Sequence, residues 1–395
     1  MKAPSHEDAF QALLLQAAGE GRGEVLFADS LERVQQQVPP FLVGDKFPSV
    51  YLEFPLLGDP FLDVTLLYSE LAPGVRIEHP AAAGSEGMMD WFAGLDNHKN
   101  SGANPGPAPN TNSGANPGSS PNTNSAPNPS QGSKNNVSTN NKNGASASAL
   151  SGNRKDLDIC CGFELDTKNP ELPAAAVHFQ PRAHTELVRP FCEAVGEPDR
   201  AKLYLDMAAR MPEGWPLSFF GMFRGRHGSP LRVCGYMGAD EKALCAQDPQ
   251  RLMGVFDSLG FTAYDDTMVQ ETCTLLGLAG NAADFQFDVY PDGSLGDTFA
   301  LDNSFDIERP ENVQDSFANG PASRVMQFFQ ERGVADERWH LSSDMTFARA
   351  IPVSNEDGSK SKYAFVVFPK WVKARWRAGV LQPAKMYTYV HACFL

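Results

Sequence analysis

The sequence lacks a long apolar run and an excess of basic residues. No stretch reaches the ~18 consecutive apolar residues that a membrane-spanning helix needs. The chain carries 33 basic and 48 acidic residues, for a net charge of −15. General nucleic-acid binders and proteins of anionic membranes present a basic face, which this balance disfavours. We therefore expect neither a nucleic-acid partner nor a membrane partner.

Regular cysteine spacing is also missing. The seven cysteines form no CxxC pair and no Cys/His spacing typical of zinc. Cys160 and Cys161 are adjacent, which suits neither a bridge between them nor a zinc site. The amino-terminal MKAPSHEDAFQALLLQ lacks the basic and apolar regions of a secretion signal. We therefore predict free thiols in a reducing compartment, and a cytoplasmic protein.

Two kinds of motif that bind phosphates are missing as well. No GxGxxG follows an expected strand, and no GxxxxGK[ST] occurs. Asp265 and Asp266 are not followed by the further aspartate of a DDxxD motif. We therefore expect neither a nucleotide-binding fold nor a dedicated metal site.

Residues 97–155 differ in composition from the rest of the chain. NSGANPGPAPNT from Asn100 is followed by NSGANPGSSPNT from Asn112 and by NSAPNPSQ from Asn124. Almost no residue here can bury apolar surface, so nothing would offset the entropy lost on ordering. We predict a disordered insert of Asn, Gly, Pro and Ser repeats. A role as a tether or docking segment stays open beside a simple loop expansion.

The other parts, 1–96 and 156–395, show helical pairs followed by strand pairs, repeated several times. Strands are expected in SVYLEFPLLGDPFLDVTLLY from Ser49, and DFQFDVY and DTFALDNSF are joined by the strong turn signal PDG. Strands joined by hairpins are antiparallel, which excludes a βαβ fold. Because the insert falls between the second and third strands of one series, we predict a single α+β domain interrupted by it.

The strands alternate between polar and apolar side chains. Asp284, Gln286, Asp288 and Tyr290 share one face, opposite Phe285, Phe287 and Val289. Such a sheet either leaves its polar face in water or closes into a barrel of about ten strands, with helices outside and a polar lumen. Tyrosine and arginine on the polar face, in place of lysine and glutamate, favour the closed barrel.

A ring of antiparallel hairpins, each preceded by helices, resembles the ABBA prenyltransferases, whose α-β-β-α fold is also called the PT barrel. The resemblance covers most of the folded chain as element order and as the chemistry of the polar face. It implies transfer of an isoprenoid from an allylic diphosphate, such as dimethylallyl or geranyl diphosphate, to an aromatic small molecule or a peptide side chain. It also implies that no cofactor is required, with Mg²⁺ at most assisting.

This chemistry requires cations for the departing diphosphate, aromatic rings for the carbocation and a base for the released proton. Glu53 on the first strand matches the position where the family commonly carries its glutamate, so it is the candidate catalytic base. The candidate diphosphate-binding residues are Arg224, Arg226, Arg232, Lys362, Lys373, Arg375 and Lys385. The candidate carbocation shield is Tyr236, Tyr290, Tyr387 and Tyr389.

Simpler interpretations remain beside these. Glu53 would also suit a solvated strand, and the run from Lys370 to Arg377 would also suit a basic surface stretch or a helix. His178 and His391 are expected to be polar groups of the barrel that are not bases. The alternative to an enzyme is a non-catalytic small-ligand-binding barrel or a scaffold protein that works through its insert.

Overall fold

Strands with one apolar and one polar face form the centre of the molecule, as the alternation predicts. The computed structural model describes residues 2–95, 159–166, 176–223, 228–281, 283–354 and 358–395. The predicted disordered insert of residues 97–155 lies outside them, as do Arg224 and Arg226.

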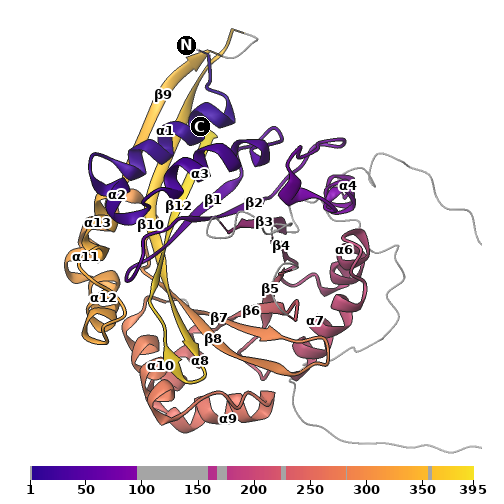
Figure 1. Cartoon of the computed structure of the whole chain (residues 1–395), viewed down its shortest axis with the longest axis vertical. Helices are drawn as coiled ribbons and strands as arrows, with labels where there is room; N and C mark the ends of the chain where they lie inside the picture. Colours follow the sequence, from indigo (N-terminus) through magenta and orange to yellow (C-terminus); the bar gives the residue numbers. More distant parts are fainter. Residues whose placement is uncertain (1, 96–158, 167–175, 224–227, 282, 355–357) are drawn as a thin grey trace, which may run out of the picture.

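Ten antiparallel strands close into a barrel (Figure 1). Their order around the ring is β10-β12-β1-β2-β3-β4-β5-β6-β7-β8, and β8 pairs with β10 to complete it. β9 and β11 pair with β10 outside the ring. The prediction of a closed antiparallel barrel of about ten strands is therefore confirmed.

The ring brings together strands from both sides of the predicted insert, since β2 pairs with β3 and Tyr68 lies opposite Cys161. The ring strands are β1 (Ser49–Pro55), β2 (Asp63–Tyr68), β3 (Cys160–Leu165), β4 (Ala176–Gln180), β5 (Leu217–Met222), β6 (Leu231–Met237), β7 (Ala283–Val289), β8 (Leu295–Ser304), β10 (Lys360–Arg377) and β12 (Lys385–Phe394). The two strands outside it are β9 (Phe347–Ser354) and β11 (Val380–Leu381).

Helices surround the barrel on its outside (Figure 1). They are α1 (His6–Ala18), α2 (Arg22–Leu26), α3 (Ser30–Gln37), α4 (Glu86–Gly94), α6 (Val188–Ala194), α7 (Asp199–Arg210), α8 (Ala239–Gln247), α9 (Pro249–Leu259), α10 (Asp266–Leu278), α11 (Val313–Asn319), α12 (Pro321–Glu331) and α13 (Trp339–Asp344). Short 3-10 turns are η1 (Pro39–Phe41), η2 (Pro80–Ala82), η5 (Thr185–Leu187) and η6 (Pro310–Asn312). The sequence patterns did not predict α2, α4, α8 or α11, and they left the segment of α13 unassigned.

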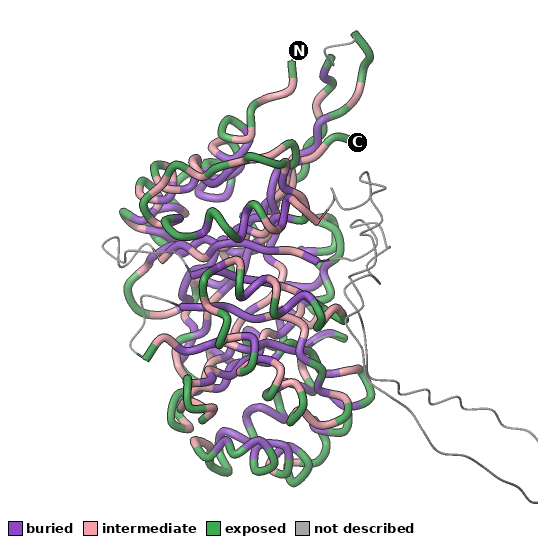
Figure 2. The backbone as a smooth tube through the Cα atoms, turned by 90° about the vertical axis from the view of Figure 1, so that its right-hand side faces the viewer, coloured by how far each residue is buried: buried purple, intermediate pink, exposed green. Residues whose placement is uncertain are grey.

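The apolar core lies between the barrel and the helices, because the apolar faces of the strands point outward. Phe285 and Phe287 of β7 are almost fully buried there. Trp376 of β10 is fully buried, and its indole Nε1 donates a hydrogen bond to Glu271 of α10 at 2.9 Å. Figure 2 shows the same layering, with buried backbone through the strands and exposed segments on the helices. The polar faces are therefore left to line the lumen.

None of the helices that the structure describes is long and apolar enough to cross a membrane.

Candidate active site

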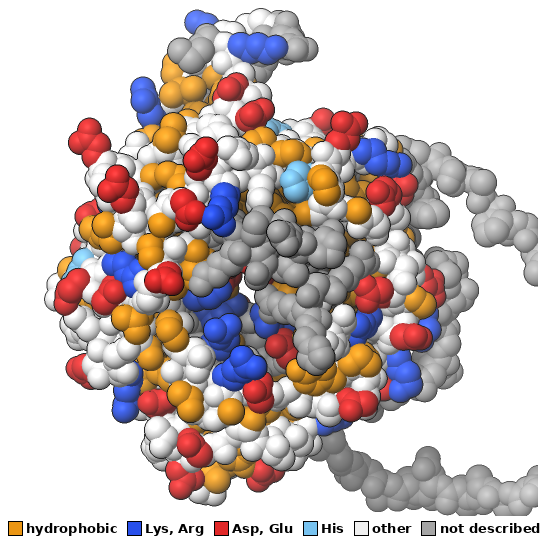
Figure 3. All heavy atoms as spheres, viewed as in Figure 1, with side chains coloured by type: hydrophobic (Ala, Val, Ile, Leu, Met, Phe, Trp, Pro, Cys, Tyr) orange, Lys and Arg blue, Asp and Glu red, His pale blue; other side chains and the backbone are white. Residues whose placement is uncertain are grey.

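Four cationic side chains meet at one end of the lumen. They come from β6, β10 and β12 and line a cavity of about 570 Å³: Arg232, Lys373, Arg375 and Lys385. Acidic residues line the same cavity: Glu53, Asp59, Asp63, Glu164, Asp166 and Asp288. Figure 3 shows lysine and arginine side chains gathered in a hollow near the centre of this face. Lys373 and Lys385 occupy directly opposite positions of the β10–β12 pair. Like charges placed opposite one another destabilise a sheet.

Carboxylates hold these cations in place. Arg232 makes a two-point ion pair with Asp288, at 2.9 and 3.2 Å. Lys385 donates to Glu53 at 2.5 Å and lies 3.6 Å from Asp63. Because planar two-point pairs and buried ion pairs restrict side-chain rotation, Arg232 and Lys385 are fixed before any ligand arrives.

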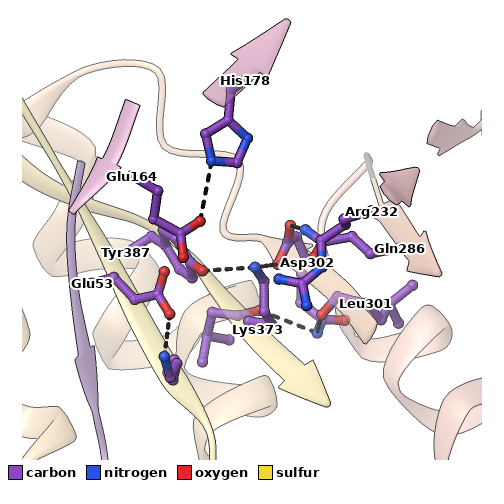
Figure 4. Close-up of polar contacts among 12 residues, drawn as sticks. Glu53, Glu164, His178, Arg232, Gln286, Leu301, Asp302, Lys373 and Tyr387 are labelled. Atoms are coloured by element: carbon purple, nitrogen blue, oxygen red, sulfur yellow. Dashed lines mark hydrogen bonds and ion pairs between the residues drawn. The ribbon is translucent and has the colours of Figure 1, made fainter. Parts of the chain in front are cut away.

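Lys373 is held differently. Its Nζ donates to the Tyr387 hydroxyl at 2.7 Å and lies 3.7 Å from Asp302. Asp302 in turn accepts a hydrogen bond from the Gln286 amide at 2.6 Å. Figure 4 shows these side chains converging from facing walls of the barrel. Lys373 therefore connects the cationic end to the aromatic wall described below.

Lys385 lies beside two buried carboxylates, Glu53 and Asp63, and the pKa values of the two differ. Burial tends to raise the pKa of Glu53, but the charges of Lys385 and Lys373 outweigh burial and lower it. Burial raises the pKa of Asp63 to about 7, and Lys385 only partly opposes it. Glu53 is therefore the ionised partner of Lys385, and Asp63 is a carboxyl that titrates near neutral pH.

Aromatic rings line the middle of the lumen. A second cavity of about 230 Å³ shares Glu53, Lys373 and Tyr387 with the first. In its wall, the ring of Trp371 lies 4.9 Å from that of Tyr51 and 5.5 Å from that of Tyr387, centroid to centroid. Tyr51 also packs on Tyr389 at 5.4 Å. This wall presents π faces next to the cationic end.

The structure brings together six of the predicted site residues around the first cavity, and Tyr389 packs behind Tyr51. The six are Glu53, Arg232, Lys373, Arg375, Lys385 and Tyr387. The run from Lys370 to Arg377 belongs to β10, so it is neither a helix nor wholly a surface stretch. His178 is a buried polar group of the lumen, as expected.

Three predicted residues lie elsewhere. Lys362 is eleven positions before Lys373 on β10, which places it about 35 Å away, where β10 pairs with β9 outside the ring. Tyr236 is 47% exposed at the opposite mouth of the barrel. Tyr290 lies in the turn after β7, where a side chain on Gly228 would collide with its ring. Arg224 and Arg226 lie outside the described residues.

Several lining residues were not among the predicted ones. Tyr51 shares the face of Glu53 on β1, so the alternation alone contained that signal. Asp63 needs the hairpin register, which sets it directly opposite Glu53. Glu164 needs the register of β3 and β4, which brings it to His178. Asp302 and Trp371 need the closed ring, because Lys373 and Tyr51 beside them come from strands far apart in the chain.

Within the described residues, no group of three or more His, Cys, Asp and Glu side chains is arranged to hold a metal ion. No protein-family model matches the chain, and no curated protein matches it.

Solved structures of two kinds are similar to the chain. The 5-dimethylallyltryptophan synthase from Streptomyces coelicolor, in complex with DMASPP and Trp, is 16% identical, with 98% of this chain and 95% of that chain covered and a TM-score of 0.43. The prenyltransferase PriB, in a ternary complex with L-tryptophan and dimethylallyl thiolodiphosphate, is 13% identical, with 98% and 96% covered and a TM-score of 0.45.

Helices alternate with antiparallel hairpins along the sequence, and ten strands close into a ring inside them with a polar lumen. This is the α-β-β-α architecture of the PT barrel, which the sequence resemblance predicted.

Proposed function

We propose that the protein is a prenyltransferase that moves an isoprenoid from an allylic diphosphate to an aromatic small molecule or a peptide side chain. The observation that carries the proposal is that the cluster of cationic side chains and the aromatic wall lie next to each other in one closed lumen. Lys373 touches both: it lines the cationic cavity and donates to Tyr387 of the aromatic wall. A substrate with an anionic end and an apolar chain fits this arrangement.

The diphosphate would bind among Arg232, Lys373, Arg375 and Lys385. Lys373 and Lys385 sit directly opposite each other, so one diphosphate could contact both, sharing them with their carboxylate partners Asp302 and Glu53. Cations fixed on strands stabilise the charge that builds on the departing diphosphate without reorganising. Mg²⁺ is not required in this proposal and would only accompany the diphosphate.

The transfer itself needs three events. The bond between the prenyl carbon and the diphosphate oxygen breaks, and its electron pair leaves with the diphosphate. The π faces of Tyr387 and its neighbours stabilise the carbocation and keep water away from it. The acceptor ring then forms a bond to the prenyl carbon and loses a proton to a carboxylate, for which Glu53 lies between the two cavities.

The test is incubation with dimethylallyl or geranyl diphosphate and a panel of indoles, phenols and peptides, followed by mass spectrometry. We expect a product heavier by one prenyl group. Lys373→Ala should lower kcat/KM about 100-fold, because it removes a preorganised cation. Lys360→Ala is the matched control, since Lys360 is an exposed lysine of the same strand. The proposal is refuted if no combination of donor and acceptor gives transfer and the protein binds neither diphosphate.

A small-ligand-binding barrel without catalysis is the second candidate. It is favoured by the carboxylates that already pair with Arg232 and Lys385, since a neutral ligand would leave those pairs intact. This candidate predicts that a ligand raises the melting temperature without being turned over. Glu53→Gln should leave the size of this stabilisation unchanged.

A further inference from the structure

The lumen does not end at the aromatic wall. The second cavity, of about 230 Å³, continues into a third cavity of about 740 Å³ at the opposite mouth of the barrel. Four residues line both of these cavities: Gln180, Arg182, Ser218 and Asp284. Because the first and second cavities also share residues, the three form one passage from the cationic mouth to the opposite one. We call the opposite opening, lined by Arg182, Ser218, Tyr236 and Asp284, the far mouth.

Two neighbouring strands show how the lining changes along this passage. On β6, Arg232 lines the first cavity, Cys234 the second and Tyr236 the third. On β7, Asp288 lines the first cavity and Asp284 lines the third. Four residues along a strand rise about 13 Å. The two mouths are therefore separate openings with different side chains.

The backbone of the far mouth is irregular at two places that contact each other. Arg182, just after β4, has a φ of 49°, in the left-handed region that residues other than glycine rarely occupy. Its backbone N–H donates to the Ser218 carbonyl at 3.1 Å. Ser218 lies where the register of β5 shifts, between Leu217 and Phe219. Because such bulges redirect side chains at barrel rims, Arg182 and Ser218 both line the junction of the second and third cavities.

The far mouth suits an uncharged aromatic molecule. The acidic and basic residues that line it are Asp284 and Arg182, one of each sign. The ring of Tyr236 is 47% exposed there, so an arriving ring has an aromatic surface to stack on. The first mouth instead contains ion pairs such as that of Arg232 with Asp288. An uncharged ring that passed them would remove water from charged groups without replacing its hydrogen bonds, which is costly.

The proposed position of the diphosphate also closes the first mouth. A diphosphate bound among the four cations fills the first cavity, and its prenyl chain extends past Lys373 toward Tyr387 and the second cavity. The acceptor must reach that second cavity while the donor stays in place. Among the residues that the structure describes, the far mouth is the opening that remains for it.

We propose that the two substrates use opposite mouths. The allylic diphosphate enters through the cationic mouth, whereas the aromatic acceptor enters, and its prenylated product leaves, through the far mouth past Ser218 and Tyr236. The inference rests on the proposed function and adds the route of each substrate to it. Neither substrate then has to wait for the other, and a substituent too large for the lumen can stay outside the far mouth during transfer.

Association rates distinguish two routes from one. Stopped-flow fluorescence measures the binding of 7-hydroxycoumarin, a fluorescent phenol, to the full chain with and without saturating dimethylallyl thiolodiphosphate, a donor analogue. With separate mouths, the analogue should change the association rate constant of the phenol by less than about twofold. A fall of more than about tenfold would mean that the two ligands share one mouth, and it would overturn the proposal.

A plug that is added after folding tests the far mouth itself. Ser218→Cys capped with N-benzylmaleimide should slow 7-hydroxycoumarin association by about tenfold or more, because the added ring overfills the junction. Its affinity for the thiolodiphosphate should stay within about threefold of wild type. Ser258→Cys is the matched control, since Ser258 is exposed on α9 outside the barrel. Wild type treated with the same reagent controls for the native cysteines, and both controls should keep the untreated values.

The reciprocal plug lies at the cationic mouth. Thr298 of β8 lines the first cavity. Capped Thr298→Cys should weaken thiolodiphosphate binding by about tenfold or more and leave 7-hydroxycoumarin association within about threefold. Equal effects on both ligands in either capped variant would overturn the proposal, because one plug would then act on both routes.

These outcomes separate the routes from the proposed function. If only the plug at Ser218 slows the phenol but no donor and acceptor give transfer, the proposed function fails and the far-mouth route stands. If transfer occurs but the plug at Ser218 has no effect on the phenol, the proposed function stands and the route is wrong. Absence of 7-hydroxycoumarin binding to wild type would also overturn the route.

Discussion

Lys385 Nζ lies 2.5 Å from Glu53 Oε1, although 332 positions separate the two residues in the sequence. The contact crosses the β1–β12 pair, in which Glu53 lies opposite Tyr387 and Pro55 opposite Lys385. It combines the candidate base and one candidate diphosphate ligand in a single buried pair. Changing one member should therefore affect both stability and any chemistry.

The stability of this pair can be measured with substitutions that remove its charges. Glu53→Gln and Lys385→Met should each lower the free energy of unfolding by about 2–4 kcal/mol, because each removes the hydrogen-bonded ion partner of a buried charge and leaves only the more distant Asp63 or Lys373 to offset it. The double variant should lose little more than either single variant, giving a coupling energy of more than about 1 kcal/mol in urea unfolding. Strictly additive losses would show that the pair contributes nothing as a pair.

Asp63 should make the stability depend on pH. Its pKa is about 7 in the folded protein, mainly through burial, and 3.8 is the ordinary value. Between these values the folded state binds more protons than the unfolded state, so the contribution of Asp63 to stability is full below pH 4 and is lost as pH rises through 7. Asp63→Asn should remove this dependence and gain stability relative to wild type by up to about 4 kcal/mol between pH 4 and pH 8.

Urea unfolding of both proteins at pH 4.5, 6.0 and 7.5 measures this difference directly. Asp284, whose pKa burial likewise raises to about 7, is present in both proteins and cancels in the comparison. A gap between the two proteins that stays constant with pH would contradict the assignment.

Tyr387 should control what happens to the carbocation. Tyr387→Leu removes a π face of the lumen wall, and a desolvated cation–π contact contributes about 2 kcal/mol, so transfer should slow about 30-fold. Water should then compete, and prenyl alcohol should rise relative to prenylated acceptor in product analysis. Tyr387→Phe keeps the ring and removes only the hydroxyl that Lys373 contacts, so its product ratio should remain like wild type.

Chelation tests the role of metal. If the four cations supply the positive charge that the diphosphate needs, about 10 mM EDTA should slow transfer by less than about tenfold. The initial rate with and without added Mg²⁺ is the measurement. Complete loss of activity in EDTA, restored by Mg²⁺, would show that the cationic cavity is insufficient on its own.

Deletion of residues 97–155 separates an enzyme from a scaffold. Because β2 and β3 pair directly, the two parts of the chain stay together without this stretch. Joining them by a short Gly/Ser linker changes closure entropy only slightly. We expect kcat/KM to stay within about twofold, whereas a scaffold that works through the insert would lose its partner in a pull-down.

Periodicity predicted which face of each strand is polar, and that face does line the lumen, as Lys385 and Tyr387 of β12 show. It did not predict how far along the barrel a residue stands. Tyr236 and Tyr290 have the right alternation, but Tyr236 lies at the far mouth of the barrel and Tyr290 lies just beyond the end of β7. Lys362 lies on a part of β10 outside the ring. Height along a barrel depends on strand length and stagger, which are set by pairing across the ring.

The contacts between strands were also beyond the sequence patterns. His178 was correctly expected to be a buried polar group of the barrel, yet its partner Glu164 becomes visible only when β3 and β4 are aligned with Gly162 opposite His178. Helix α8 was missed because ADEKALCAQ has little separation of polar and apolar residues around its axis. Local patterns therefore gave the architecture, and the register gave the site.

The pairing of β1 with β12 means that the first strand of the ring has no partner on one side until the last strand has been made. During synthesis the growing chain holds Glu53 on an open sheet edge while the intervening hairpins form. Such an edge invites wrong pairing, and contacts this distant in sequence form slowly. A chain truncated before Lys385 should therefore aggregate, because its ring stays open. In the full chain, Glu53 should form its ion pair with Lys385 only when the barrel closes.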